Sequence, residues 1–315
     1  MIYTLQNDIL TVQISDIGAE IHSVKRGDCE YIWVGDPAFW SSHAPLLFPV
    51  CGRFFEATYT CEGKTYEIPC HGFIRKEPLT LACVNDTSIC FLVEATEQTK
   101  KMYPFDFVLK IWHILEGESV ITRFEIENKG DVPLPATVGG HPGFNLPLGG
   151  EGAFEDYYLE FGKPCSPNQI EISPRGLFTG KKTAYPLVDG NKLPLSHKLF
   201  EIDGIFLSRM DSSVTLKSNK STRSVTLEYP DMPYLGIWHA ARCEAPFVCI
   251  EPWCGLPGYD GEMEDINTRH DMFRILYGMF YLIKFIFTCL FWNCADYFCL
   301  FLFLFELENG FVMLY

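Results

Sequence analysis

The sequence lacks several signals that mark common protein classes. It has no Gly-x-Ser-x-Gly turn for a serine nucleophile and no Gly-x-x-x-x-Gly-Lys loop for phosphates, which argues against such hydrolases and against NTPases. Its N-terminus shows no basic segment followed by an apolar one, so we expect no signal peptide. The 13 cysteines are odd in number and lack zinc-type paired spacing. These absences predict a cytoplasmic protein with reduced thiols and no disulfide framework.

Positive charge is also scarce. The chain has 40 Asp and Glu against 25 Lys and Arg, giving a formal net charge of −15. A protein this acidic repels the phosphates of nucleic acid and the anionic surface of a membrane. We therefore expect no nucleic acid partner, and a membrane only through the C-terminal segment. A neutral small molecule is the better match, and the sequence does not indicate an oligomeric state.

Long amphipathic helices are missing before the C-terminal segment, where strand patterns dominate instead. Apolar residues alternate with polar ones at Leu10, Val12 and Ile14, and again at Ile21 and Val24 after a turn, as in a hairpin of half-buried strands. Similar runs occur at 88–94, 107–115, 120–127, 214–217, 225–229 and 248–250. Short strands without intervening helices predict an all-β fold, a large antiparallel β-sandwich.

The last part of the chain has a different composition. No linker or repeat divides the rest, so we predict one domain over 1–275 and an atypical hydrophobic tail over 276–315. Nine of the 26 Phe lie in the last 37 residues, but Lys284, Asn293 and Asp296 interrupt the apolar run. Out-of-frame translation explains such a change; a membrane anchor and a remodelled terminal strand or helix are alternatives. A lost terminal strand would leave a sheet edge unpaired.

Four short loops combine reactive side chains with glycine, proline or aromatic residues: PVCGR at 49–53, HGFIR at 71–75, GGHPGFN at 139–145 and EPWCG at 251–255. Acids, a base and flat apolar surfaces suit proton transfer on a polyhydroxylated ring. One strong carboxylate beside histidines favours proton shuttling over glycoside hydrolysis, which needs two facing carboxylates. We expect no metal, because neither His71 nor His141 has a compact ligand set nearby in the sequence.

Longer motifs add a family resemblance. DILTVQISDIGAEIHSV, DPAFW followed by APLLFPVCGRF, HGFIRKEP, VGGHPGFNLPL, LGIWH and CIEPWCGLPGYDG occur in this order. In these motifs the chain from Met1 to about Arg274 resembles the aldose 1-epimerase (galactose mutarotase-like) family, most closely its LacX-like bacterial branch. The resemblance implies a galactose mutarotase-like β-sandwich, an aldohexose substrate and no cofactor.

The resemblance also implies roles for three catalytic residues. Glu251 in EPW corresponds to the base that takes the proton of the anomeric hydroxyl, and His141 in GGHP to the acid that protonates the ring oxygen. His71 in HGF corresponds to the second site histidine, which hydrogen-bonds the ring oxygen or a neighbouring hydroxyl. The expected reaction is the interconversion of α and β anomers through the open-chain aldehyde.

Substrate-binding residues follow in the same way. Arg53 in CGRF resembles the family's sugar-holding arginine, a planar donor fork suited to vicinal oxygens. For the binding aspartate we favour Asp203 over Asp211, because Asp203 precedes an apolar strand-like run. Arg75, with Lys76, is a candidate for a sugar phosphate or a solvated surface group. Aromatic candidates for stacking on a pyranose, with the core as alternative, are Trp238, Trp253 and Phe144.

We therefore predict a cytoplasmic mutarotase acting on an aldohexose. Two alternatives stay open: a carbohydrate-binding homologue without catalytic activity, and a hexose-6-phosphate mutarotase. The sequence does not name the sugar, because anomeric chemistry uses atoms that all aldohexoses share.

Overall fold

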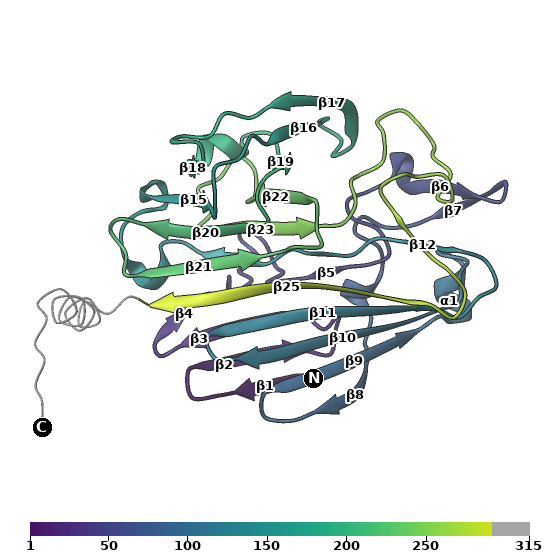
Figure 1. Cartoon of the computed structure of the whole chain (residues 1–315), viewed down its shortest axis with the longest axis horizontal. Coiled ribbons are helices and arrows are strands. Elements are labelled where there is room, and N and C mark those ends of the chain that lie inside the picture. The colour runs from purple at the N-terminus through teal and green to yellow at the C-terminus, as the bar shows by residue number, and fades with distance from the viewer. Residues whose placement is uncertain (292–315) are drawn as a thin grey trace, which may run out of the picture.

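The computed structural model describes residues 1–291 and consists mainly of antiparallel strands (Figure 1). The α-helical part of this range is the single turn α1 (Glu97–Lys100), which Thr96 caps. Five 3-10 turns complete the helical content: η1 (Phe55–Ala57), η2 (Ile74–Lys76), η3 (Leu148–Gly150), η4 (Phe154–Asp156) and η5 (His197–Phe200). The predicted all-β fold is therefore confirmed.

A nine-stranded sheet forms one layer. Its order is β18 (Lys192–Pro194), β15 (Tyr157–Phe161), β20 (Ser213–Ser218), β21 (Arg223–Glu228), β25 (Phe280–Phe291), β11 (Ser119–Asn128), β10 (Phe107–Glu116), β9 (Ser88–Glu94) and β8 (Thr80–Val84). The long hairpin β10–β11 pairs in register from Phe107 opposite Asn128 to Glu116 opposite Ser119. The strand runs predicted from 88 to 229 lie in these strands, except that Tyr229 follows the end of β21. The run predicted at 248–250 lies in β23 (Phe247–Trp253) of the second sheet.

An eight-stranded sheet carries the site. Its order is β17 (Phe178–Ala184), β16 (Asn168–Ile172), β19 (Ile205–Ser208), β22 (Tyr234–Trp238), β23 (Phe247–Trp253), β13 (Gly139–Gly140) and β5 (Leu46–Leu47), and β14 (Gly143–Asn145) also pairs with β23. A four-stranded sheet has the order β1 (Ile2–Gln6), β2 (Leu10–Ser15), β3 (Ile21–Arg26) and β4 (Cys29–Glu30). Two two-stranded sheets pair β6 (Thr58–Cys61) with β7 (Lys64–Glu67) and β12 (Leu134–Ala136) with β24 (Phe273–Ile275). The predicted N-terminal hairpin is β2–β3.

Strand β23 is buried on both faces, and its successive side chains point alternately into the main core and into smaller apolar clusters. Val248 and Ile250 belong to the large core that also contains residues of the nine-stranded sheet. Phe247 and Trp253 belong to two separate apolar clusters. Because successive side chains of a strand point to opposite faces, Glu251 lies on the same face as these two aromatics, away from the main core.

The segment after residue 275 differs from the prediction. β25 pairs with β11 at nine positions and with β21 at six, so it is an interior strand of the sheet, drawn in yellow in Figure 1. The buried residues Ile283, Phe285, Phe287 and Cys289 alternate with more exposed ones. This strand pattern was hard to read in the sequence, because several outward positions are apolar as well. The boundary predicted at 275 thus cuts through the sandwich.

The tail predictions divide at residue 291. A remodelled terminal strand is the alternative that fits 280–291. The predictions of out-of-frame translation and of a membrane anchor also concern residues 292–315, which lie outside the described residues. Within residues 1–291, none of the helices is both long and apolar enough to cross a membrane.

Candidate active site

One cavity of about 300 Å³ brings the predicted site residues together. Its lining includes the predicted catalytic residues Glu251, His141 and His71 and the predicted binding residues Arg53, Asp203, Arg75 and Trp238. These residues come from β22, β23 and the loops around them, and are up to about 200 positions apart in the sequence. The sandwich therefore assembles all seven predicted side chains at one place.

Glu251 and His141 form a buried pair in this cavity. Nε2 of His141 lies 3.1 Å from Oε2 of Glu251. The backbone N–H of His141 donates to the carbonyl of Pro45 at 3.0 Å, which fixes the histidine directly after β13. Glu251 is 1% exposed and His141 is 9% exposed, so neither group is well solvated. The two groups are therefore in close contact in a poorly solvated environment, where electrostatic interactions are strong.

Each member of the pair keeps one free polar atom. Glu251 Oε1 and His141 Nδ1 are buried and have no hydrogen-bond partner within residues 1–291. Buried polar atoms in folded proteins are nearly always paired, so an orphaned atom next to a cavity calls for a partner. A polyhydroxylated ligand supplies such partners.

Burial sets the protonation of the pair. It raises the pKa of the Glu251 carboxyl well above its ordinary value, and the nearby Asp203 adds to the rise. Burial lowers the pKa of the His141 imidazole to about 3. Both shifts favour the uncharged forms, a protonated Glu251 and a neutral His141, so together they favour one proton on the pair.

His71 is placed by a tight turn. Its own φ is +66°, and the following Gly72 has a φ of +72°. A Cβ at position 72 would come within 2.0 Å of the Phe48 carbonyl oxygen, so only glycine fits there. His71 Nδ1 accepts the backbone N–H of Gly52 at 3.1 Å, and burial lowers the pKa of His71 well below its ordinary value. The neutral ring therefore carries its proton on Nε2, as a hydrogen-bond donor.

Two arginines and an aspartate supply polar groups to the same cavity. Five arginines of the described chain pair with carboxylates, as Arg269 does with Glu264 at 3.0 Å. Arg53 and Arg75, like Arg209, Arg242 and Arg274, have no such partner within residues 1–291, and of these five only Arg53 and Arg75 line the cavity. Asp203 Oδ1 accepts the N–H of Gly204 at 2.8 Å. Asp211, the alternative to Asp203, instead lies 3.2 Å from Lys163 and is absent from the lining.

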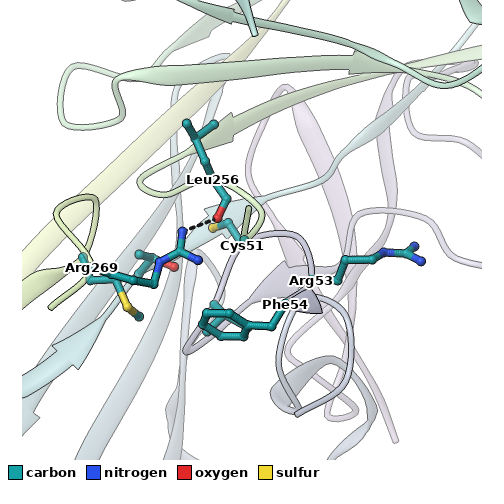
Figure 2. A pocket seen from close by; sticks show the side chains of 9 residues that line it. Cys51, Arg53, Phe54, Leu256 and Arg269 are labelled. Atoms are coloured by element: carbon teal, nitrogen blue, oxygen red, sulfur yellow. Dashed lines mark hydrogen bonds between the residues drawn. The ribbon is translucent and has the colours of Figure 1, made fainter. Parts of the chain in front are cut away.

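A second, water-sized cavity beneath the Arg53 loop supports the site. Figure 2 shows Arg269 directed at the Leu256 carbonyl, to which it donates at 2.8 Å, while Arg53 extends away from Arg269. Arg269 also lies 4.9 Å from the Phe54 ring centroid and 2.7 Å from Asp271. This buried cluster ties the loop after Glu251 to the loop that carries Arg53. The side chain of Arg53 remains available to the larger cavity.

Aromatic side chains form part of the cavity wall. Trp238 and Trp253 line it as predicted for stacking candidates, whereas Phe144 is fully buried and packs 5.9 Å from Phe287, so its core alternative is correct. Sequence reasoning missed Trp40, whose ring lies 5.0 Å from that of His141 and 5.6 Å from that of Trp238. Its place at the end of the DPAFW motif was the available signal.

Metal-ligand side chains also meet here, despite their distance in the sequence. His141, Cys249 and Glu251 offer donor atoms within 4.8 Å of one another. Metal binding requires the thiol and the carboxyl to be deprotonated. Burial raises the pKa of the Cys249 thiol, as it does that of Glu251, so the site favours the protonated forms. An acid–base pair therefore describes these groups better than a resident metal centre.

Comparison with known proteins shows the family of the chain. The family model for aldose 1-epimerase matches residues 1–259. The chain is 35% identical over 280 residues to protein LacX (chromosomal) of Lactococcus lactis subsp. lactis, covering 86% of this chain and 92% of that protein. The structure superimposes on a galactose mutarotase related enzyme from Lactobacillus acidophilus with a TM-score of 0.87 and 33% identity, over 92% and 97% of the two chains. A galactose mutarotase-like protein from Lactobacillus casei gives 0.85 and 29%, over 92% and 100%. The chain belongs to the aldose 1-epimerase family.

Proposed function

We propose that this protein is an active mutarotase, which interconverts the α and β anomers of an aldohexose. The observation that carries the proposal is the buried Glu251–His141 pair, 3.1 Å apart, with an unpartnered atom on each member in a cavity that also holds two arginines. General acid–base catalysis requires one group that accepts a proton and one that donates a proton to the same ligand. A pair that holds a single proton meets this requirement.

The reaction uses that proton in both directions. In the working state Glu251 is the carboxylate and His141 the imidazolium, which has the same proton count as the neutral pair. Glu251 takes the proton of the O1 hydroxyl, the C1–O5 bond breaks as the C1 carbonyl forms, and O5 takes the proton of His141. After rotation about the C1–C2 bond, O5 attacks the other face of C1 and returns its proton to His141. Glu251 then returns its proton to O1, and both residues regain their starting states.

The other groups hold the sugar during this cycle. The Nε2–H of His71 donates to the ring oxygen or a neighbouring hydroxyl, Arg53 presents a planar donor fork to vicinal hydroxyls, and Asp203 accepts from another hydroxyl. The indoles of Trp40 and Trp238 meet edge to face and offer apolar surface to a pyranose. The free thiols of all 11 cysteines in residues 1–291 support a reducing compartment such as the cytoplasm.

Polarimetry tests this mechanism. Wild-type protein is expected to accelerate the approach of fresh α-glucose or α-galactose to its equilibrium rotation. Glu251→Gln and His141→Asn should each lower kcat by about 10² to 10⁴, because each removes one proton-transfer group. The matched controls Glu62→Gln and His270→Asn alter exposed residues and should keep the wild-type rate. Unchanged rates in the two site variants would show that the roles assigned here are wrong.

The binding-only alternative predicts a different result. If wild-type protein binds the hexose in a calorimeter without accelerating its mutarotation, the protein is a carbohydrate-binding homologue. Calorimetry on Glu251→Gln further separates the enzyme from the binding-only homologue. If Glu251 acts only in catalysis, the variant should bind the sugar with an affinity within a few fold of the wild-type value.

One observation favours a phosphorylated hexose as the substrate. Arg53 and Arg75 line the same cavity, and neither has a carboxylate partner within residues 1–291, although the chain is strongly acidic overall. Guanidinium groups recognise phosphate through charge-assisted, bidentate hydrogen bonds. On this alternative, kcat/KM for glucose 6-phosphate exceeds that for glucose, and Arg75→Gln removes the difference. Equal values for the two sugars would favour the free hexose.

A further inference from the structure

A second cluster of ligand-type side chains lies outside the cavity lining, where β3 begins. Glu20 directly precedes β3, His22 lies on β3, and His43 lies in the loop before β5. Their donor atoms lie within 4.8 Å of one another. We propose that Glu20, His22 and His43 form a binding site for a divalent transition-metal ion of the zinc, nickel and copper class.

The carboxylate of Glu20 is anchored between the two rings. Its Oε1 accepts the backbone N–H groups of His43 at 2.6 Å and Ala44 at 3.0 Å. Its Oε2 lies 3.5 Å from Nε2 of His22, and its Oε1 lies 3.8 Å from Nδ1 of His43. Neighbouring ligands of a first-row metal are about 3 Å apart at ordinary metal–ligand distances of about 2.0–2.2 Å. To reach one ion, the three donors need side-chain shifts of about 1 Å. At least one imidazole must also rotate out of the stack, so that both lone pairs point to the ion.

The two imidazoles are ordered against each other. Their rings stack with centroids 4.0 Å apart and planes inclined by 12°. Nδ1 of His43 is buried and has no hydrogen-bond partner within the described range, 1–291. The side chain of His22 is 29% exposed, which leaves a path from solvent to the cluster. Two imidazoles and one carboxylate are the donor set that this class of metal prefers.

Charge also favours a cation at this place. The Glu20 carboxylate accepts two backbone N–H groups, which stabilise its negatively charged form. Within residues 1–291, the only basic side chains with a nitrogen within 4.0 Å of the Glu20 carboxylate oxygens are His22 and His43; no Lys or Arg lies that close. Unlike the Cys249 set in the sugar cavity, this set needs no buried thiol to lose its proton.

A purely structural role explains only part of this arrangement. Glu20 holds the backbone at residues 43 and 44, and this function requires neither the stacked pair of imidazoles nor the orphaned Nδ1 atom. The segment is also connected to the sugar site, because the carbonyl of His43 accepts the N–H of Gly143 at 2.9 Å and that of Pro45 accepts the N–H of His141 at 3.0 Å. A bound ion would stiffen the segment that holds His141, without taking part in proton transfer.

Calorimetry with Ni²⁺ tests the proposal, because nickel binds imidazole well and is less attracted to thiols than zinc is. Tag-free, full-length, reduced protein is treated with a chelator, exchanged into buffer and titrated with Ni²⁺ alone. We expect one ion per chain, and a rise of the thermal midpoint with Ni²⁺ concentration. His22→Asn, at a part-exposed position that tolerates change, should weaken binding at least about tenfold, and His43→Gln should do the same.

Two control variants make the outcome decisive. His270→Asn removes an exposed histidine elsewhere, and Cys249→Ala removes a donor of the catalytic-cavity set; both should keep wild-type Ni²⁺ affinity. Absence of Ni²⁺ binding to wild-type protein, or binding that survives His22→Asn, would overturn the proposal. Loss of binding in Cys249→Ala alone would also overturn it, since the ion would then occupy the sugar cavity.

Discussion

The contact between Phe285 and Gly140 provides a sharp test of how the C-terminal strand supports the site. Phe285 on β25 is 2% exposed, and a Cβ built on Gly140 would lie 2.6 Å from its ring carbon Cζ. Gly140 directly precedes His141. The ring of Phe285 therefore packs against the backbone that positions His141, and only a glycine allows this approach.

The expected energies follow from this packing. Phe285→Ala leaves a cavity in the main core and should lower the free energy of unfolding by about 3–5 kcal/mol. Gly140→Ala overpacks the same place and should cost about 1–3 kcal/mol. In the double variant the new methyl group occupies space that the ring has left. The two costs should therefore not add, and the shortfall should be about 1–3 kcal/mol.

Urea unfolding followed by tryptophan fluorescence measures all three values, with polarimetry on the folded variants. Leu282→Ala, at a half-exposed position of the same strand, is the matched control and should change stability by about 0.5 kcal/mol or less. Gly140→Ala should also slow mutarotation, because the clash is relieved most easily by moving residue 141. A cost below about 1 kcal/mol for Phe285→Ala, or strict additivity in the double variant, would refute the packing described here.

Further expectations concern stability and binding. A chain ended after Ile275 loses interior strand β25 and should not fold, as judged by circular dichroism, whereas ending it after Phe291 keeps all described strands. Burial lowers the pKa of His113 to about 4, so the folded state binds fewer protons than the unfolded state between pH 6.5 and pH 4. The free energy of unfolding should therefore fall by about 3 kcal/mol as the pH drops through this window. His113→Gln should flatten that part of the plot of urea midpoint against pH. Arg269→Met leaves two carboxylates without their partner and should cost about 3–5 kcal/mol by urea unfolding, while Arg242→Met on the surface should be near neutral. Trp40→Ala should raise KM more than it lowers kcat in polarimetric assays, because the indole lines the cavity and transfers no proton in the proposed mechanism.

The sequence pointed to side chains that the structure brings to one cavity, because each sits in a short motif whose local geometry is self-contained. His71 needs the glycine that follows it for its turn, and Glu251 needs the alternation of β23 to leave the core. Both requirements are visible within five residues. Their meeting in one cavity was supplied by the family resemblance, since contacts between residues about 180 positions apart leave no local trace.

The errors have a physical origin of the same kind. Strand β25 is apolar on both faces, so its period of two is weak, and hydropathy alone suggested a separate tail. The cluster that we propose as a metal site joins β3 to a loop about 20 residues away, so the spacing of ligands in the sequence does not indicate it. Trp40 was hidden because an aromatic residue at the end of a loop is usually a packing residue.

The proton count of the pair links burial to function. If Glu251 were solvated, it would hold no proton at neutral pH, and His141 would share its proton with water; the pair would then exchange protons with solvent at each step. Burial raises the pKa of Glu251 and lowers that of His141, which favours one proton on the pair. A sugar bound between them transfers this proton without a change in the net charge of the site. The same burial depends on the packing of β25, whose Phe285 lies against Gly140, so the proposed proton transfer depends on the C-terminal strand as the fold does.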